Sequence, residues 1–306
     1  MKESLRIVFL GTPEFAVASL EKLVISGCNV VAVVTAPDKP QGRGKQLGMS
    51  AVKEFAISAG LPVLQPTNLK SLDFLEELKS YKADLQIVVA FRMLPEAVWN
   101  MPPLGTFNLH GSLLPQYRGA APINWAIING EKETGVTTFF LKHQIDTGKI
   151  IFQEKEPILD DDNVGTVYDR LMKKGADLVL KTVRAIENND YPQTEQDESI
   201  ELKHAPKIFR EDCEIDWSRP AVEIRNFIRG LSPYPAAWTM LNDLNLKVFR
   251  VEFTEHASTK GMGEFDTDGK NFIRVKTGNG VLEIMELQLQ GKKRMQVDEF
   301  LRGYQL

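Results

Sequence analysis

Short, almost wholly apolar runs alternate with amphipathic stretches over the first ninety residues. Runs at 5–10, 30–35 and 84–90 are typical of strands that are buried on both faces of a parallel sheet. Between the first two runs, residues 15–24 place apolar side chains at helical spacing, and Pro13 precedes them where a first helical turn accepts proline. A strand, a helix and a second strand in this order predict a doubly wound, Rossmann-like α/β sheet.

Similar patterns continue to about residue 189. Ser50 is placed to cap a helix that runs to residue 59, and the longest helical pattern covers 164–187. Further elements are predicted as strands at 62–65, 105–110, 134–142 and 149–156, and as helices at 72–81 and 120–129. Residues 1–189 are therefore expected to form the first, α/β domain.

The pattern changes after residue 189. Residues 190–206 are polar with little apolar periodicity, as in a linker between domains. A helical segment at 221–231 follows, and then short alternating runs separated by Gly, Asn and Asp turns at 237–241, 246–253, 263–266, 272–276 and 280–289. Short strands with such turns predict a small OB-like β-barrel domain over 207–306.

Composition is that of an ordinary globular protein, with 43% hydrophobic and 25% charged residues in a chain of 306. No apolar run approaches the roughly 20 residues that span a bilayer. The first strand begins within a few residues of the start, which leaves no room for a signal peptide, so we expect a cytoplasmic protein without membrane partners. Cys28 and Cys213 lie far apart and form neither a disulfide framework nor a metal site.

The charge balance restricts the possible nucleic-acid contacts. With 37 basic and 41 acidic residues the formal charge is −4, so any RNA contact must come from a local basic patch. Residues 36–48, APDKPQGRGKQLG, are such a patch and carry Lys39, Arg43 and Lys45 among two prolines and three glycines. Composition leaves two interpretations open: a solvated connection, or a basic finger that becomes ordered on RNA.

Candidate chemistry centres on the strand predicted at 105–110. Asn108 and His110 share one face near its carboxyl end, where open α/β sheets bind ligands. A carboxamide can donate to a developing oxyanion and an imidazole can move protons, which suits acyl transfer. Asp146, in a turn before an apolar run, is placed to orient the imidazole and favour its charged form. The first turn holds a single glycine, Gly11, so a dinucleotide cofactor is not expected.

Residues 108–123, NLHGSLLPQYRGAAPI, and the downstream IDTG at 145–148 resemble the 10-formyltetrahydrofolate-dependent formyltransferase family. The resemblance implies that Asn108, His110 and Asp146 are catalytic, that 10-formyltetrahydrofolate is the formyl-donor substrate and that no metal takes part. It also implies that the folate contacts Phe91, Arg92, Met93, Leu94, Ser112, Leu113, Leu114 and Pro115. Residues 142–144 depart from the family pattern, which leaves the shape of that loop open.

Within this family, residues 36–48 resemble the basic insertion by which some members reach the acceptor stem of initiator tRNA. Residues 216–238 resemble the entry to the C-terminal domain of the same members. The implied acceptor is initiator methionyl-tRNA, contacted by Lys39, Arg43 and Lys45, and the protein is expected to be a monomer.

Two alternatives remain. The first is a formyltransferase of the same fold that acts on a small amine, such as a sugar amine or glycinamide ribonucleotide. The basic patch and the second domain count against it, because a small acceptor needs neither. The second is a non-catalytic RNA-binding protein, against which the intact set of Asn108, His110 and Asp146 counts.

Overall fold

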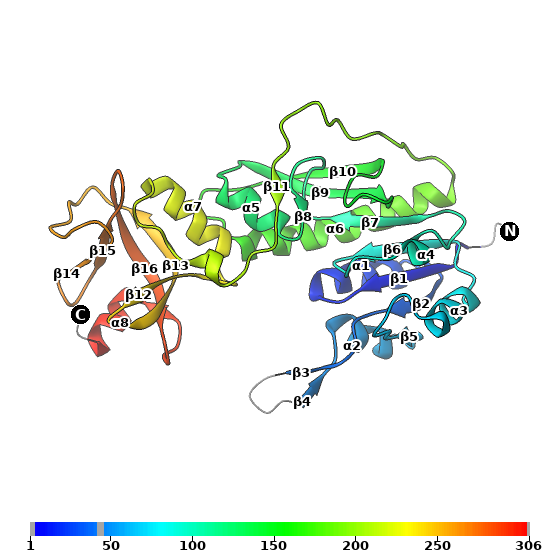
Figure 1. Cartoon of the computed structure of the whole chain (residues 1–306), viewed down its shortest axis with the longest axis horizontal. Coiled ribbons are helices and arrows are strands. Elements are labelled where there is room, and N and C mark those ends of the chain that lie inside the picture. Colours follow the sequence, from blue (N-terminus) through cyan, green and yellow to red (C-terminus); the bar gives the residue numbers. More distant parts are fainter. Residues whose placement is uncertain (1–3, 42–45, 305–306) are drawn as a thin grey trace. The chain divides into compact units, whose positions relative to one another are not determined.

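The computed structural model describes residues 4–41 and 46–304 and divides the chain into two compact units (Figure 1). The first unit contains the residues up to Arg118 together with Gly135–Glu156 and Asp169–Lys203. The second contains Gly119–Thr134, Pro157–Tyr168 and the residues from His204 onward. Each unit is therefore assembled from segments that are separated along the sequence.

A seven-stranded sheet with the order β10-β9-β7-β6-β1-β2-β5 forms the centre of the first unit. Its strands are β1 (Ile7–Gly11), β2 (Val30–Val34), β5 (Val63–Leu64), β6 (Leu85–Val89), β7 (Thr106–His110), β9 (Glu133–Phe140) and β10 (Ile150–Pro157). Strands β5, β2, β1, β6 and β7 are parallel, whereas β9 runs antiparallel to β7. The chain order reverses between β1 and β6, so the predicted doubly wound sheet is confirmed.

The continuous apolar runs correspond to the most buried strands. All five residues of β1 and all five of β6 are buried, because helices cover both faces of the sheet (Figure 1). The helices of this unit are α1 (Glu14–Ile25), α2 (Ala51–Ser58), α3 (Leu72–Ser80), α4 (Glu96–Trp99) and most of α6 (Val164–Glu187). The predicted cap of α2 is confirmed, since the Ser50 hydroxyl accepts a hydrogen bond from the Lys53 amide at 3.1 Å.

Helix α6 lies directly against the strand that carries Asn108 and His110. A Cβ atom at Gly175 would lie 2.7 Å from the Leu109 side chain, so the close approach requires glycine. Further along the helix, the Thr182 hydroxyl is 2.9 Å from the hydroxyl of Thr138 on β9. Leu109 therefore points toward α6, and its neighbours in β7 point to the other face.

The basic patch at residues 36–48 contains a hairpin. Strand β3 (Lys39–Gln41) pairs antiparallel with β4 (Gln46–Gly48). The residues between the two strands, including Arg43 and Lys45, lie outside the described residues. At the base of the hairpin, the Asp38 carboxylate accepts hydrogen bonds from Lys53 at 2.6 Å and Gln65 at 2.8 Å.

The second unit combines helices with an antiparallel sheet. The sheet contains β12 (Ala237–Leu241), β13 (Leu244–Phe253), β14 (Phe265–Thr267), β15 (Ile273–Lys276), β16 (Val281–Leu289) and β17 (Met295–Gln296). The helices are α5 (Pro122–Ile128), α7 (Ala221–Leu231), α8 (Val297–Gly303) and the short 3-10 helix η1 (Glu211–Cys213). A two-residue pairing joins β8 (Arg118–Gly119) to β11 (His204–Ala205). The predicted small β domain is confirmed as a curled antiparallel sheet, whereas β17 and α8 were not predicted.

Residues 190–206 have the polar composition of a linker, yet many of them are hydrogen-bonded to other parts of the chain. The amide and carbonyl of Thr194 pair with those of Ile150 at the start of β10. Up to Lys203 the segment belongs to the first unit. In the described part of the chain, no helix is both long and apolar enough to cross a membrane.

Candidate active site

Strand β7 presents Asn108 and His110 on one face of the sheet. In the register with β9, Asn108 lies opposite Phe139 and His110 opposite Thr137. Because Leu109 faces α6, the two polar side chains point away from that helix. Both lie at the carboxyl end of the parallel strands, next to the end of β6.

The imidazole of His110 is buried and held at one nitrogen. Its Nε2 atom lies 2.8 Å from the carbonyl oxygen of Tyr117, and since a carbonyl only accepts, Nε2 carries a hydrogen and donates. The ring also meets the edge of Phe139, with the centroids 6.5 Å apart. Nδ1 is therefore the nitrogen that faces Asp146, whose Oδ2 atom is 3.9 Å away. This is an ion-pair distance and too long for a direct hydrogen bond.

Asp146 belongs to a tight loop between β9 and β10. It is 8% exposed and has a φ of 54°, which is uncommon for a residue with a side chain. Two residues later, a Cβ atom on Gly148 would lie 1.5 Å from the carbonyl oxygen of Phe140, so only glycine allows the loop to close against the end of β9. A steric requirement thus explains why the IDTG motif ends in glycine at position 148.

The residues that depart from the family pattern lie on the exposed part of the same loop. Lys142, His143 and Gln144 are all exposed. The His143 ring packs edge-on against Trp99, with centroids 5.5 Å apart, and its Nε2 atom is 3.5 Å from the Glu96 carboxylate. These contacts connect His143 to α4.

Asn108 carries an unsatisfied buried atom. Its Oδ1 atom is buried and has no hydrogen-bond partner among the described residues. A buried polar atom left in this state costs about 1–3 kcal/mol, and such an atom in a native protein calls for an explanation. At the carboxyl end of a parallel strand, a ligand that completes the hydrogen bonding of the carboxamide is a natural explanation.

A hydrogen-bond network fixes the loop that follows His110. The hydroxyl of Thr137 donates to the carbonyl of Ser112 at 2.6 Å and accepts from the amide of Leu114 at 3.2 Å. Gln153 donates both to that hydroxyl and to the carbonyl of Leu114. Thr137 and Gln153 were not singled out in the sequence, where they are two of many polar residues on alternating strands.

The eight residues expected to contact folate lie on two loops that follow neighbouring strands. Ser112 and Leu114 are buried and Leu113 and Pro115 half-buried, in the loop after β7. After β6, Leu94 packs in the core, whereas Met93 is 73% exposed. Because β6 and β7 pair side by side, the structure brings the two loops to the same edge of the sheet.

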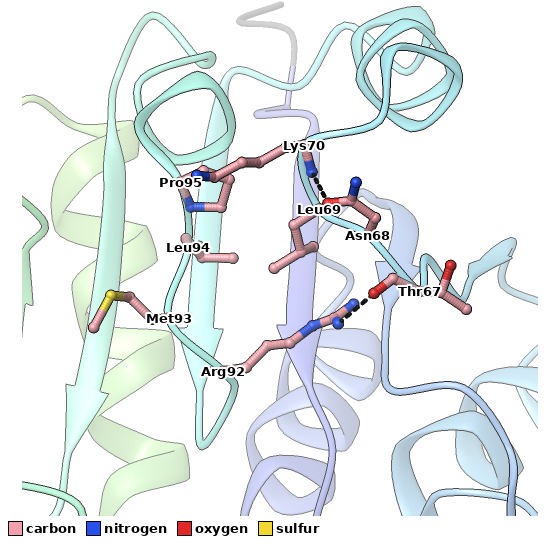
Figure 2. A pocket seen from close by; sticks show the side chains of 8 residues that line it. All are labelled: Thr67, Asn68, Leu69, Lys70, Arg92, Met93, Leu94 and Pro95. Atoms are coloured by element: carbon pink, nitrogen blue, oxygen red, sulfur yellow. Dashed lines mark hydrogen bonds between the residues drawn. The ribbon is translucent and has the colours of Figure 1, made fainter.

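A cavity of about 430 Å³ opens beside the loop after β6 (Figure 2). Arg92 crosses it and donates to the carbonyl oxygens of Thr67, at 3.1 Å, and Pro66. The same guanidinium lies 5.6 Å from the centre of the Phe91 ring. The cavity is lined by Thr67, Asn68, Leu69, Lys70, Arg92, Met93, Leu94 and Pro95. Three of the expected folate contacts are in this lining, and those of the loop after β7 are not.

Of the three expected tRNA contacts, Lys39 is placed by the structure. It lies exposed on β3, one residue after the bonded Asp38. The hydrogen bond from Lys53, and next that from Gln65, hold the pKa of the Asp38 carboxyl below its usual range. The arm that carries Lys39 is therefore fixed at its base.

The described residues contain no group of three or more His, Cys, Asp and Glu side chains arranged to hold a metal ion. Both cysteines are buried thiols, Cys28 in the first unit and Cys213 in the second. Burial raises the pKa of each thiol, as expected for inert structural cysteines.

Two family models match the chain in sequence order. The model described as Formyl transferase matches residues 5–183, and the model described as Formyl transferase, C-terminal domain, matches residues 207–305. Among solved structures, the sugar 3N-formyltransferase WlaRD, in the presence of dTDP and 5-N-formyl-THF, has a TM-score of 0.67 and 21% identity, covering 95% of this chain and 100% of that one. HypX from Aquifex aeolicus in complex with tetrahydrofolic acid has a TM-score of 0.64 and 20% identity over 98% of this chain. This chain spans about half the length of HypX (48%), and at these identities the likeness shows the fold.

Much closer relatives are named methionyl-tRNA formyltransferase. One from Bacteroides fragilis is 56% identical over 313 residues, which cover 100% of this chain and 97% of the relative. Another from Parabacteroides distasonis is 58% identical and covers 99% of this chain and 97% of the relative. With both domain models in order and this identity along its whole length, the chain belongs to the methionyl-tRNA formyltransferase family.

Proposed function

We propose that this enzyme transfers a formyl group from 10-formyltetrahydrofolate to the α-amino group of methionine carried by initiator tRNA. One observation carries the proposal: the unsatisfied carboxamide oxygen of Asn108 lies on the same strand face as His110, whose Nδ1 atom faces the Asp146 carboxylate. Relatives that share more than half of its residues are named for the same reaction.

The chemistry requires stabilisation of charge and movement of one proton. The uncharged amine attacks the formyl carbon, and a tetrahedral intermediate with an oxyanion forms. The bond from that carbon to N10 of the folate then breaks, and the proton lost by the amine is balanced by one gained at N10. Asn108 donates to the oxyanion through its carboxamide NH₂ group. No bond to the enzyme forms at any stage.

His110 stabilises the oxyanion in its charged form. It passes a proton to the departing nitrogen from Nδ1, because Nε2 is engaged by the Tyr117 carbonyl and Nδ1 is too far from Asp146 for a direct hydrogen bond. In that form the ring has a hydrogen on both nitrogens, and both then face acceptors: the Tyr117 carbonyl at 2.8 Å and the Asp146 carboxylate at 3.9 Å. Asp146 thereby orients the ring, and it also acts through an ordered water.

The folate is proposed to lie across residues 91–94 and 112–115, with the edge of its pterin ring hydrogen-bonded to backbone groups. The position of both loops at one edge of the sheet supports this placement. Two structural neighbours of the same fold were solved with a folate, WlaRD with 5-N-formyl-THF and HypX with tetrahydrofolic acid, which supports a folate as the donor. Its 10-formyl form supplies the transferable group.

The tRNA is proposed to contact Lys39, Arg43 and Lys45. Lys39 lies on the β3–β4 hairpin, and the other two lie outside the described residues. Because the protein is acidic overall, a modest number of phosphate contacts is expected, with a clear salt dependence. We further propose that the enzyme acts as a monomer in the cytoplasm, with residues 1–189 as the catalytic part, 190–206 as the connection and 207–306 as the C-terminal part.

A transfer assay tests the proposal. The purified protein is incubated with 10-formyltetrahydrofolate labelled in the formyl group and with methionyl initiator tRNA, and the label on acid-precipitated tRNA is counted. Parallel reactions offer a nucleotide-linked sugar amine and glycinamide ribonucleotide. Label on the tRNA alone supports the proposal, and label on a small amine alone overturns it. Tight tRNA binding without folate binding would instead favour a non-catalytic RNA-binding protein.

A further inference from the structure

Residues 194–203, here called the strap, run across the loop that carries Asp146 and are tied at both ends. At one end, Thr194 and Ile150 exchange two backbone hydrogen bonds of 2.8 and 2.9 Å. At the other end, the Lys203 carbonyl accepts from the Tyr117 amide at 2.6 Å, and the Lys203 amide donates to the Gln116 side chain at 2.8 Å. The strap therefore has a defined path over the first unit.

The side chain of Gln196, within the strap, joins two separate parts of the site. Its Nε2 atom donates to the carbonyl oxygens of Asp146, at 2.8 Å, and Gly148, at 2.9 Å. Its Oε1 atom accepts from Nε and Nη2 of Arg118, at 3.1 and 2.7 Å. Only a carboxamide offers a donor and an acceptor in this way, so neither Glu nor Leu reproduces the set.

Both parts that Gln196 joins hold a partner of His110. Arg118 directly follows Tyr117, whose carbonyl accepts a hydrogen bond from His110 Nε2. The Arg118 side chain is only 11% exposed and forms an ion pair with Glu198 at 3.0 Å. On the other side, Gln196 bonds to the peptide that follows Asp146, a residue held at a φ of 54°. This conformation persists only where neighbouring groups fix it.

We propose that Gln196 is a positioning residue that sets the Asp146 carboxylate against His110. It acts through the backbone of the Asp146 loop and touches no reacting atom. The inference rests on the proposed function, because it assigns Asp146 a role in the transfer. It also explains why a polar residue in a segment with linker composition makes four hydrogen bonds within the catalytic unit.

Gln196→Glu is the informative variant. It keeps the size of the side chain and its pairing with Arg118, but it places a carboxylate oxygen against two carbonyl oxygens and removes the donor. The loop must then move, and a displacement of this kind lowers turnover by about 10- to 100-fold. Gln193→Glu is the matched control, since Gln193 is exposed in the same segment and the charge change is identical. We expect KM for the folate to stay within about twofold in both variants, because neither residue belongs to the proposed folate loops.

A double-mutant cycle separates positioning from general stability. If Gln196 acts through Asp146, Gln196→Glu has little further effect once Asp146 is replaced by Asn. An equal fold-loss in the wild-type and Asp146→Asn backgrounds would overturn the proposal, and so would unchanged turnover in Gln196→Glu. Thermal unfolding of each variant shows whether the loss merely follows unfolding.

Hydrogen exchange provides a readout that needs no substrate. Amides of the segment 144–149 should exchange faster in Gln196→Glu and at the wild-type rate in Gln193→Glu, since only the former removes the bonds to this loop. Identical exchange in all three proteins would overturn the proposal. If the wild-type protein transfers formyl to a small amine instead of tRNA, the proposed acceptor is wrong, and the cycle is measured with that amine. If the wild-type protein transfers formyl to no acceptor, the hydrogen-exchange rates alone test whether Gln196 fixes the Asp146 loop.

Discussion

The Nδ1 atom of His110 lies 3.9 Å from Oδ2 of Asp146, and the two side chains are only 7% and 10% exposed. At this separation the two side chains are within ion-pair distance but too far apart for a direct hydrogen bond, and a charge interaction between them would be stronger in this buried position than in water. Catalytic hydrogen bonds are often long in a site without substrate and shorten when it binds. The relationship therefore fits a pair that closes on binding.

Replacing Asp146 by Asn should lower turnover by about 100-fold or more. The variant keeps the shape of the side chain but removes the charge that faces His110. Single-turnover formyl transfer measures the effect apart from product release. Asp161→Asn is the control, because that aspartate is exposed in a turn outside the site. Comparable rates for the two variants would show that Asp146 has no part in the chemistry.

Replacing His110 by Ala should also lower turnover by about 100-fold or more, the scale of a group that moves a proton or stabilises an oxyanion. The fold should be retained, which circular dichroism and thermal unfolding check. His143→Ala is a suitable control, since this histidine is exposed on the nearby Asp146 loop. A purified, folded His110→Ala enzyme with near-normal turnover would remove His110 from the mechanism.

Much of this architecture is predictable from local sequence pattern. Helices α6 and α7 have the bounds that their periodicity predicts, because long amphipathic stretches identify a helix clearly. Strands β1 and β2 are continuous apolar runs between turns, and β6 is apolar apart from Gln86. The alternation of residue types in β7 likewise predicts that Asn108 and His110 share one face of that strand.

The contacts that complete the site were not predictable in this way. Gln196 meets Arg118 and Asp146, which are 78 and 50 residues away, from a polar segment without periodicity. The partner of His110 Nε2 is a backbone carbonyl, and because every residue has one, the sequence does not indicate which residue provides it. The hairpin at residues 39–48 was not predicted, because its Gly and Pro content gives it a low strand propensity. Its base is fixed by hydrogen bonds from Lys53 and Gln65 to Asp38, and these residues are distant in the sequence.

Replacing Asn108 by Leu should separate activity from stability. Turnover should fall by about 100- to 1,000-fold, the scale for loss of one oxyanion donor. The melting temperature should stay the same or rise, because Leu has a similar size and removes a buried oxygen without a hydrogen-bond partner among the described residues. Differential scanning calorimetry and steady-state kinetics on one preparation check both parts. A marked fall in melting temperature would mean that the carboxamide supports the fold.

The Asp38 carboxylate should make the stability of the protein depend on pH. Its folded-state pKa is lowered by the hydrogen bonds from Lys53 and Gln65, so its contribution is present above the ordinary Asp pKa of about 3.9. That contribution is lost as the pH falls through the lower folded-state pKa. Asp38→Asn should therefore be less stable than the wild type at pH 7, and the difference should shrink toward pH 3.

Urea unfolding midpoints from pH 7 to pH 3 measure this difference. Asp73→Asn is the control for the loss of one negative charge, since Asp73 is exposed on α3. If the difference in urea midpoint between the wild type and Asp38→Asn stays constant from pH 7 to pH 3, the charge of Asp38 contributes nothing to the stability of the protein. Because Asp38 precedes Lys39, the same variant should raise KM for methionyl-tRNA at pH 7 without changing KM for the folate.

Changing Arg43 and Lys45 to Ala should weaken the use of methionyl-tRNA and leave folate binding intact. Both belong to the basic patch at residues 36–48, whose arm at Lys39 is exposed on the fixed β3 strand. If both contact phosphates, the slope of log affinity against log salt flattens by somewhat less than about one per residue. If one reads the shape or a base at the acceptor end, discrimination between initiator and elongator tRNA falls more than affinity does.

The matched control is Lys79→Ala with Lys173→Ala, which removes two lysines from helices α3 and α6, away from the basic patch. An equal loss of tRNA affinity in the two double variants would mean that only the net charge of the protein matters, because a long-range attraction does not depend on whether the lost charges belong to the basic patch. A loss confined to Arg43 and Lys45 shows a local contact. If the Arg43 and Lys45 double variant shows unchanged tRNA kinetics at physiological salt, residues 36–48 are a solvated connection. The acceptor would then more plainly be a small amine, because a small acceptor needs no contact with the basic patch.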